Sequence, residues 1–288
     1  MRGVPQPVPP RACTGARTRW HDGLVPTPAP LDVSVEAPPL GGPRILSQRW
    51  SDVVFVHWRV DAALVAAHMP PGCVPDEHDG SSWVGLIAFH MSRSTFLGGP
   101  PVPWLGDFPE VNVRLYAVDA LGRRSVVFAS LDASRLIPVL AAQVAFGLPY
   151  RWASMRHGRR GDLVAYRTRR HAAPAAASHL VVRTTSSAEA DAALVDDPLA
   201  TFLTGRWAFH ERHMGRTILC RNEHEPWPLQ HARLEHLDDG LLAAAGFPGI
   251  AEHPPESVLF APSVATRFGM PHRLDERATP SSAPDREG

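Results

Sequence analysis

Polar side chains alternate with apolar ones between residues 110 and 116, and this run carries the groups best suited to chemistry. Glu110, Asn112, Arg114 and Tyr116 share one face of a predicted strand, because successive side chains of a strand point to opposite faces. A glutamate whose pKa is raised by burial serves as an acid or base, and a guanidinium offers a forked donor to a carboxylate. Such a face lines a ligand cavity inside a closed barrel, but faces solvent on an open sheet. Periodicity alone leaves both alternatives open.

Two histidines, His57 and His90, each lie in an apolar run that predicts a strand. Such a histidine is ordinarily a core residue with satisfied hydrogen bonds. The alternative is a pocket wall, where an imidazole serves as an acid or base. His210 and His213 form an HxxH pair without the HExxH register of a zinc site, and 15 histidines make such spacings common. We therefore expect no metal ion, and no motif for a cofactor is present.

The composition limits the chemistry and the partners. All 29 residues of the Lys+Arg total are arginines, so no lysine side chain is available for a Schiff base. The formal net charge is +0, which favours neither a nucleic-acid nor a membrane partner. Cys13, Cys73 and Cys220 form neither a disulfide framework nor a metal motif, and no secretory signal or membrane-spanning apolar run is present. These features predict a cytoplasmic protein and leave the oligomeric state open.

The segments around residues 110–116 predict the scaffold that holds this face. Apolar or alternating runs bounded by turn residues predict strands, among them residues 51–58, 83–92, 110–116, 125–132 and a strand from Tyr150. Cap and stop signals predict a helix after Asp61, one from Ser134 to Gly147, and one from Glu189 that ends at Asp197 and Pro198. Evenly spaced strands with short helices predict a mainly β (α+β) fold, an antiparallel barrel or cone with helical decoration.

The distribution of proline predicts one folded domain between two tails. Residues 1–43 hold ten of the 30 prolines and few large apolar side chains, which is typical of a disordered tail. Residues 44–274 form the predicted β-barrel domain, and the polar residues 275–288 form a disordered C-terminal tail. The glycine- and proline-rich segment 97–109 predicts a loop that leads directly to Glu110.

Several short segments together resemble the DUF2071 or YqjF-like family. They are WSDVVFVHW, EVNVRLY, SLDA, FGLPYRWASM, FLTGRW, HEPWPLQHA and VATRFGMPHRL, and they span about Ile45 to Arg273. The resemblance implies the fold of the acetoacetate decarboxylase-like superfamily, whose members enclose a small-molecule cavity in a β-barrel or cone.

The resemblance is most informative at the segment FGLPYR, residues 146–151. In acetoacetate decarboxylases a similar junction reads GFPKK and carries the Schiff-base lysine. Tyr150 and Arg151 stand at the positions of that lysine pair, so the resemblance implies the cavity but not the lysine mechanism. The candidate site comprises Glu110 and Tyr150 as catalytic groups, with Arg114, Asn112, Arg151, His57 and His90 as ligand contacts.

The leading hypothesis is therefore a protein that binds a small molecule bearing a carboxylate or carbonyl group. The alternative is a lysine-independent acid–base enzyme, a decarboxylase, hydratase or isomerase of a small oxo acid. Binding without turnover takes precedence because no nucleophile–base pair is evident in the sequence. The third hypothesis is a purely structural interaction protein, in which the strand face that carries Glu110 would be exposed.

Overall fold

The computed structural model describes residues 29–101, 106–135 and 147–274 and folds them around one 13-stranded sheet. The strands are β1 (Arg44–Val60), β2 (Cys73–Pro75), β3 (Ser82–Phe96), β4 (Phe108–Asp119), β5 (Arg124–Ala133), β6 (Tyr150–Arg160), β7 (Leu163–Arg170), β8 (Ala177–Thr184), β9 (Ala208–His213), β10 (Arg216–Glu223), β11 (Gln230–Asp239), β12 (Ser257–Gly269) and β13 (His272–Arg273). The helices are α1 (Ala62–Ala66), α3 (Ala188–Ala193), α4 (Pro198–Thr204), α5 (Leu241–Ala244) and the 3-10 helix η1 (Ile250–Glu252). Among these described helices, none is long and apolar enough to cross a membrane.

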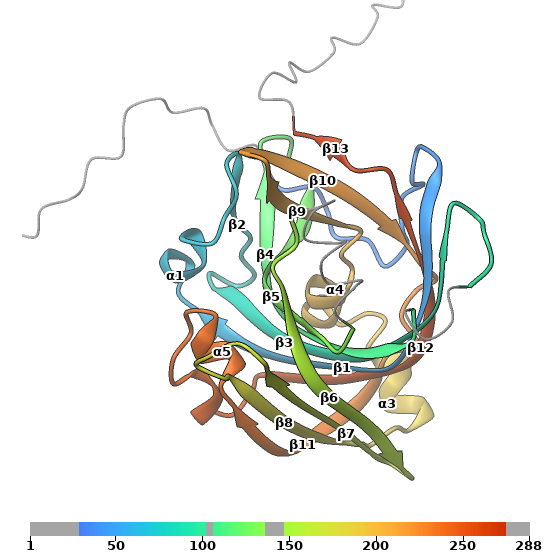
Figure 1. The fold of residues 1–288 in the computed structure, drawn as a ribbon, viewed down its shortest axis with the longest axis vertical. Coiled ribbons are helices and arrows are strands. Elements are labelled where there is room, and N and C mark those ends of the chain that lie inside the picture. The colour runs from blue at the N-terminus through green and yellow to red at the C-terminus, as the bar shows by residue number, and fades with distance from the viewer. Residues whose placement is uncertain (1–28, 102–105, 136–146, 275–288) are drawn as a thin grey trace, which may run out of the picture.

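The strand pairings close two barrel-like rings that share a wall (Figure 1). The first ring passes through β10, β9, β5, β4, β3, β1 and β12 and returns to β10. The second ring shares the wall from β5 to β12 and is completed by β6, β7, β8 and β11. Most pairs are antiparallel, while β5 runs parallel to β6 and β9. The predicted mainly β fold with short helices is confirmed, as barrel-like rings rather than one regular barrel.

The shared wall is buried on both faces, because each face looks into a different ring. On β1, Val54 and Val56 belong to the core of the second ring, whereas Val53 and Phe55 face the first. All four side chains are 0–1% exposed. A strand covered on both sides needs apolar residues at consecutive positions, which explains the unbroken run in this part of the sequence.

Strand β4 has two chemically different faces for the same reason. Val111, Val113 and Leu115 pack into the apolar core of the second ring. Glu110 and Asn112 point the opposite way, into the first ring, and are 2% and 5% exposed. The alternative of an open sheet with this polar face in solvent is therefore excluded.

Helix α4 lies inside the first ring (Figure 1). The sequence predicts a helix ending at Asp197 and Pro198, but α3 ends earlier and α4 begins at Pro198. The Asp197 carboxylate caps α4 by accepting a hydrogen bond from Leu199 N at 2.9 Å, and proline is tolerated in a first turn. The pair is thus a start signal, and Phe202 of α4 is buried within the ring.

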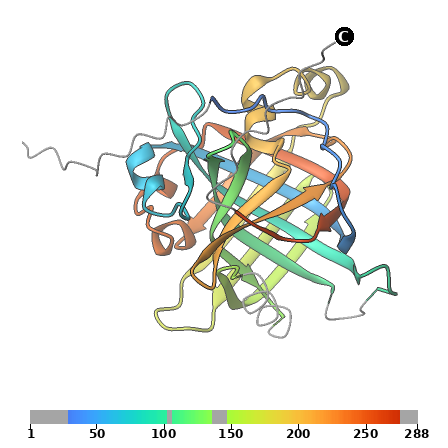
Figure 2. The same ribbon diagram turned by 90° about the horizontal axis from the view of Figure 1, so that it is seen from above.

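Helices α1 and α5 lie side by side against the second ring (Figures 1 and 2). The predicted cap of α1 is confirmed, since Asp61 accepts a hydrogen bond from Ala63 N at 2.8 Å. His68, just after α1, stacks on Phe247, just after α5, with ring centroids 5.3 Å apart. These helices therefore cover one side of the apolar core of the second ring, against which the shared wall packs.

Part of the predicted N-terminal tail lies against the sheet. Leu31 N donates to Gly122 O at 2.8 Å, and Trp207 Nε1 donates to Ser34 O at 2.8 Å. These bonds satisfy backbone groups of a proline-rich segment and hold residues 31–34 against the fold, although their composition predicts disorder. The rest of that tail (1–28), most of the predicted helix after Ser134 (136–146) and the predicted C-terminal tail (275–288) lie outside the described residues.

Candidate functional site

Three neighbouring strands of the shared wall place His57, Gly85 and Arg114 in one row. In the antiparallel register, His57 of β1 is opposite Gly85 of β3, and Gly85 is opposite Arg114 of β4. A Cβ atom at position 85 would lie 2.8 Å from His57 Cδ2 and Nε2. The glycine therefore lets the imidazole lie across β3, where its Nε2 is 2.6 Å from the hydroxyl of Tyr116.

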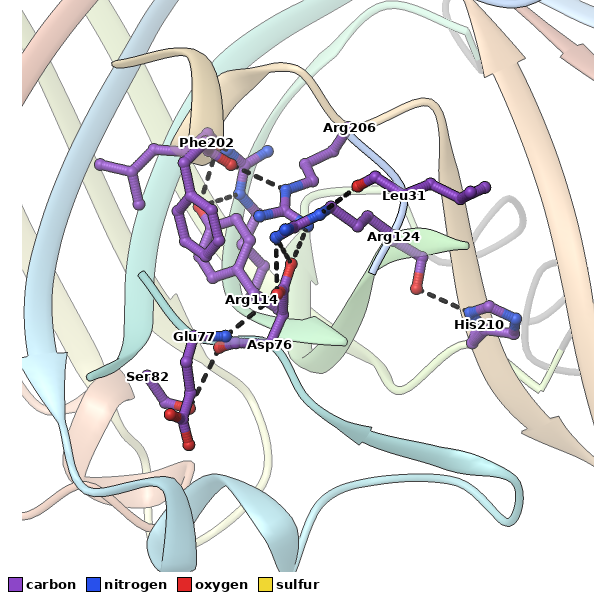
Figure 3. A network of polar contacts seen from close by, with 12 residues as sticks. Leu31, Asp76, Glu77, Ser82, Arg114, Arg124, Phe202, Arg206 and His210 are labelled. Carbon is purple, nitrogen blue, oxygen red and sulfur yellow. Dashed lines mark hydrogen bonds and ion pairs between the residues drawn. The ribbon is translucent and has the colours of Figure 1, made fainter. Parts of the chain in front are cut away.

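Arg114 is held in place by neutral groups (Figure 3). Its Nε donates to the Tyr116 hydroxyl at 3.1 Å, and its Nη2 donates to the carbonyl of Leu203, at the end of α4, at 2.6 Å. The guanidinium also lies over the ring of Phe55, 5.4 Å from its centroid. Among the described residues no carboxylate forms an ion pair with this half-buried arginine. The cation is thus positioned but not neutralised.

His57 is a neutral imidazole with one unused nitrogen. Burial, followed by the positive charges of Arg114 and Arg206, holds its pKa well below the ordinary 6.5. Its Nε2 is occupied by Tyr116 as donor or acceptor, depending on the tautomer. In either tautomer the buried Nδ1 has no hydrogen-bond partner within the described part of the chain. One imidazole nitrogen is therefore available to a ligand.

Glu110 and Tyr150 form an acid–hydroxyl pair farther along the same face. The Tyr150 hydroxyl donates to Glu110 Oε2 at 2.8 Å. Burial raises the pKa of Glu110 from 4.5 to about 7, although hydrogen bonds from Tyr150 and Asn112 favour the charged form. The buried Oδ1 of Asn112, between the glutamate and Arg114, finds no partner among the residues described. A carboxyl group that titrates near neutral pH can both give and take a proton.

An ion cluster fixes the end of α4 beside this site. Arg206 donates from Nη1 to Asp76 Oδ2 at 2.6 Å and from Nε to Phe202 O at 2.8 Å. Arg124 donates to both oxygens of the same carboxylate, at 2.7 and 2.8 Å (Figure 3). The Arg206 guanidinium lies 4.8 Å from the ring centroid of Tyr116. Asp76 therefore pairs the buried Arg206 and the partly buried Arg124. Arg206 in turn packs on the ring of Tyr116, whose hydroxyl contacts His57.

Two residues of the predicted site lie elsewhere. Strand alternation turns Phe89 into the first ring and His90 away from it. The Nε2 of His90 lies 2.8 Å from Asp107 Oδ1, and its ring stacks on His157 at 5.3 Å. Arg151 is exposed on β6, next to Tyr150. The structure thus brings His57, Asn112 and Arg114 into one interior group with Glu110 and Tyr150, but not His90 or Arg151.

His210, the first histidine of the HxxH pair, has a structural role. His210 is fully buried, with Nδ1 2.6 Å from Ser125 Oγ and Nε2 3.4 Å from Asp119 Oδ2. Within the described ranges, no group of three or more His, Cys, Asp or Glu side chains is arranged to hold a metal ion. Elsewhere in the fold, buried Asp132 pairs with Arg170 at 2.8 Å.

Sequence reasoning missed three further groups inside the first ring. Burial raises the pKa of Glu211 to about 8, and its carboxylate accepts a hydrogen bond from Phe128 N at 3.0 Å. Burial lowers the pKa of His224 to about 4. Trp227 donates to a carbonyl of α4 and meets Phe55 edge-on, with centroids 5.1 Å apart. For His224 and Trp227 the available signal was the HEPW segment, residues 224–227, whose histidine and tryptophan directly follow a strand.

The interior group lies apart from two hollows on the surface. Two surface hollows, of about 280 and 920 Å³, have linings that do not include Glu110 or Arg114. Around the interior group, Arg114, Tyr150 and Trp227 are partly exposed, whereas Glu110 and His57 are buried. Arg114, Tyr150 and Trp227 are therefore the members of this region that keep some contact with solvent.

Solved structures with this fold define the class. The chain resembles an acetoacetate decarboxylase-like enzyme from Sphingomonas wittichii RW1, with a TM-score of 0.56 at 17% identity over 81% of this chain and 93% of that one. It also resembles the enduracididine biosynthesis enzyme MppR complexed with pyruvate (TM-score 0.53, 17% identity, 81% and 91% covered). Acetoacetate decarboxylase from Legionella pneumophila gives a TM-score of 0.52 at 12% identity, with 87% and 93% covered. The fold is therefore acetoacetate decarboxylase-like, as predicted.

The sequence comparisons identify the family. The chain belongs to the DUF2071 family, described as an uncharacterized conserved protein, whose sequence model matches residues 47–265. It is 33% identical over 193 residues to the uncharacterized protein YqjF of Bacillus subtilis (strain 168), covering 66% of this chain and 77% of that protein. The predicted membership is confirmed.

Proposed function

We propose that the first ring binds a small molecule that carries a carboxylate beside a carbonyl or hydroxyl group. Arg114 is the counter-ion of the carboxylate. A protonated His57 Nδ1 would donate to a carbonyl oxygen of the ligand, whereas Asn112 Oδ1, which only accepts, would take a hydrogen bond from a hydroxyl group. The protonated or ionised Glu110, with Tyr150, lies at the far end of the same strand face, ~13 Å along the backbone from Arg114.

The observation that carries this proposal is the pairing of the arginines. Arg206 and Arg124 share Asp76, and Arg170 pairs with Asp132. Arg114 is held as firmly as these, but only by a hydroxyl and a carbonyl. A half-buried cation is stabilised most by an opposite charge, since water solvates it only in part. An anionic ligand supplies that charge.

Two further facts select the probe molecules. MppR, which shares the fold, has been solved with pyruvate, so small oxo acids are the first compounds to try. The 288 residues include no lysine, so such an acid would be held by hydrogen bonds and charge rather than by a Schiff base to a side chain. In this proposal the ligand is bound in the cytoplasm, and neither a nucleic acid nor a membrane is a partner.

Thermal unfolding with pyruvate, acetoacetate and related acids tests the proposal. A ligand at about one hundred times its Kd stabilises the folded protein by ~2.7 kcal/mol. For a chain of this size we expect a rise in Tm of roughly 5 to 11 °C. Arg114→Gln should remove the rise. Arg49→Gln is the matched control, because Arg49 is an exposed arginine of the shared wall whose guanidinium bonds, among the described residues, only Ser263 at 3.1 Å. A rise that survives in Arg114→Gln would refute the assignment.

A second candidate function is acid–base turnover of the bound acid. The pKa of about 7 for Glu110 favours it, because a general acid or base works best near the ambient pH. Glu110→Gln keeps a hydrogen-bond acceptor for the Tyr150 hydroxyl but cannot transfer a proton. For an enzyme, we expect this variant to bind the acid and lose turnover, measured by product formation. Tight binding by the wild type without product would favour a binding protein.

A further inference from the structure

The part of the second ring formed by β6, β7 and β8 has an outer face that points away from both cores (Figure 1). Val164 and Tyr166 of β7 are buried inward, in the core of the second ring. The alternate residues Arg167 and Arg169 are exposed on the other side. On β6, Arg156 lies on this outer face too, directly opposite Arg167. The outer face is therefore open and rich in arginine.

Three arginines of this face have no ion-pair partner among the described residues, although the carboxylate of Asp238 lines the same hollow. Like charges directly opposite each other in an antiparallel pair are destabilising, and Arg156 and Arg167 are such a pair. In the described part of the chain, no ion pair involves either of them or Arg169. Arg183 on β8, by contrast, forms two ion pairs, with Asp162 at 2.6 Å and with Glu235 at 2.8 Å. Three guanidiniums without an ion pair, against one carboxylate, leave this hollow with an excess of positive charge.

An aromatic pair adjoins these arginines on the same face. Trp152 of β6 is 43% exposed, and its ring centroid lies 4.0 Å from that of His171. His171 Nε2 lies 3.2 Å from Ser154 Oγ, which fixes the ring. The aromatic pair and all three arginines line one hollow of about 920 Å³. That volume is within the range of small-molecule sites, roughly 300 to 1,000 Å³.

We propose that this hollow is a second site, for a nucleotide, whose phosphates bind Arg156, Arg167 and Arg169 while its base stacks on Trp152. Arginine forks match phosphate oxygens, and an aromatic ring next to positive charge is the usual platform for a base. Trp152 and Arg156 are four residues apart, ~13 Å along the strand, so base and phosphates are contacted together. This site is separate from the interior one. The proposal of a nucleotide site does not depend on whether an oxo acid binds inside the first ring.

Calorimetric titration of the full chain with ATP, in the absence of divalent cations, tests the proposal. Inorganic triphosphate and adenosine are titrated in parallel. We expect ATP to bind more tightly than either, because only ATP uses both parts of the hollow. Adenosine equal to ATP would overturn the role of the arginines. Triphosphate equal to ATP, or no binding of ATP at millimolar concentration, would overturn the nucleotide site.

Variants separate a built site from general charge. Losing charge-assisted hydrogen bonds in the double variant Arg156→Gln, Arg169→Gln should weaken ATP binding about 10- to 100-fold. Trp152→Leu should weaken ATP binding but leave triphosphate binding unchanged. Arg160→Gln is the matched control, because Arg160 is exposed on the same strand face but does not line the hollow. Equal weakening by Arg160→Gln would overturn the proposal. So would tighter binding of a single-stranded oligonucleotide than of ATP, which would indicate a nucleic-acid surface.

Discussion

Replacing Glu110 by glutamine should stabilise the protein above neutral pH. The native pKa of about 7 exceeds the 4.5 of a solvated glutamate, so the folded protein binds a proton that the unfolded chain releases. This stabilisation is complete below pH 4.5 and is lost as the pH rises through about 7. The difference between the two pKa values corresponds to ~3 kcal/mol of unfolding free energy. Glutamine resembles the protonated side chain, so the Glu110→Gln variant does not lose unfolding free energy as the pH rises through about 7.

Urea unfolding at pH 5 and pH 9 measures the effect. At pH 5 the variant and the wild type should have similar unfolding free energies, and at pH 9 the variant should be more stable by up to ~3 kcal/mol. Glu211, whose pKa is raised to about 8, adds a pH dependence of its own, but this is common to both proteins and cancels in the difference. Equal destabilisation by Glu110→Gln at both pH values would refute the reasoning, because it would mean that Glu110 is ionised and paired in the folded state.

Three other substitutions test the supports of the interior site, each by urea unfolding and oxo-acid binding. Gly85→Ala puts a methyl group 2.8 Å from the His57 ring, so it should cost ~1 to 3 kcal/mol and abolish binding; unchanged binding would contradict the geometry. Asp76→Asn leaves the buried Arg206 without its carboxylate and should cost ~3 to 5 kcal/mol; a neutral effect would show that the ion cluster contributes little. Tyr116→Phe removes the partner of His57 Nε2 and should cost ~1 to 3 kcal/mol; unaltered stability would argue that this bond is weak.

Much of the local structure could be predicted because it depends on neighbours in sequence. The alternation from Glu110 to Tyr116 predicted both the strand and its polar face. Asp61 followed by apolar residues predicted a capped helix. Tyr150 was assigned to the same candidate site as Glu110 only through the family resemblance, and the hydrogen bond between the two, across 40 residues, was not predicted.

What could not be predicted depends on contacts between distant segments. The two-ring arrangement makes one strand serve two interiors, and no periodicity in the apolar run of β1 distinguishes that from a simple buried strand. Asp76 lies in a turn-like sequence, yet it binds Arg206, 130 residues away. His90 was placed in the site because of its apolar strand, but its side of that strand is set by the pairing of β3 with β4.

The most direct test of the account is a crystal structure of the protein with the oxo acid that gives the largest thermal shift. We expect the carboxylate of the acid within about 3 Å of the Arg114 guanidinium, and its keto oxygen near His57 Nδ1. An acid bound elsewhere, with Arg114 still bonded only to Tyr116 and Leu203, would contradict it.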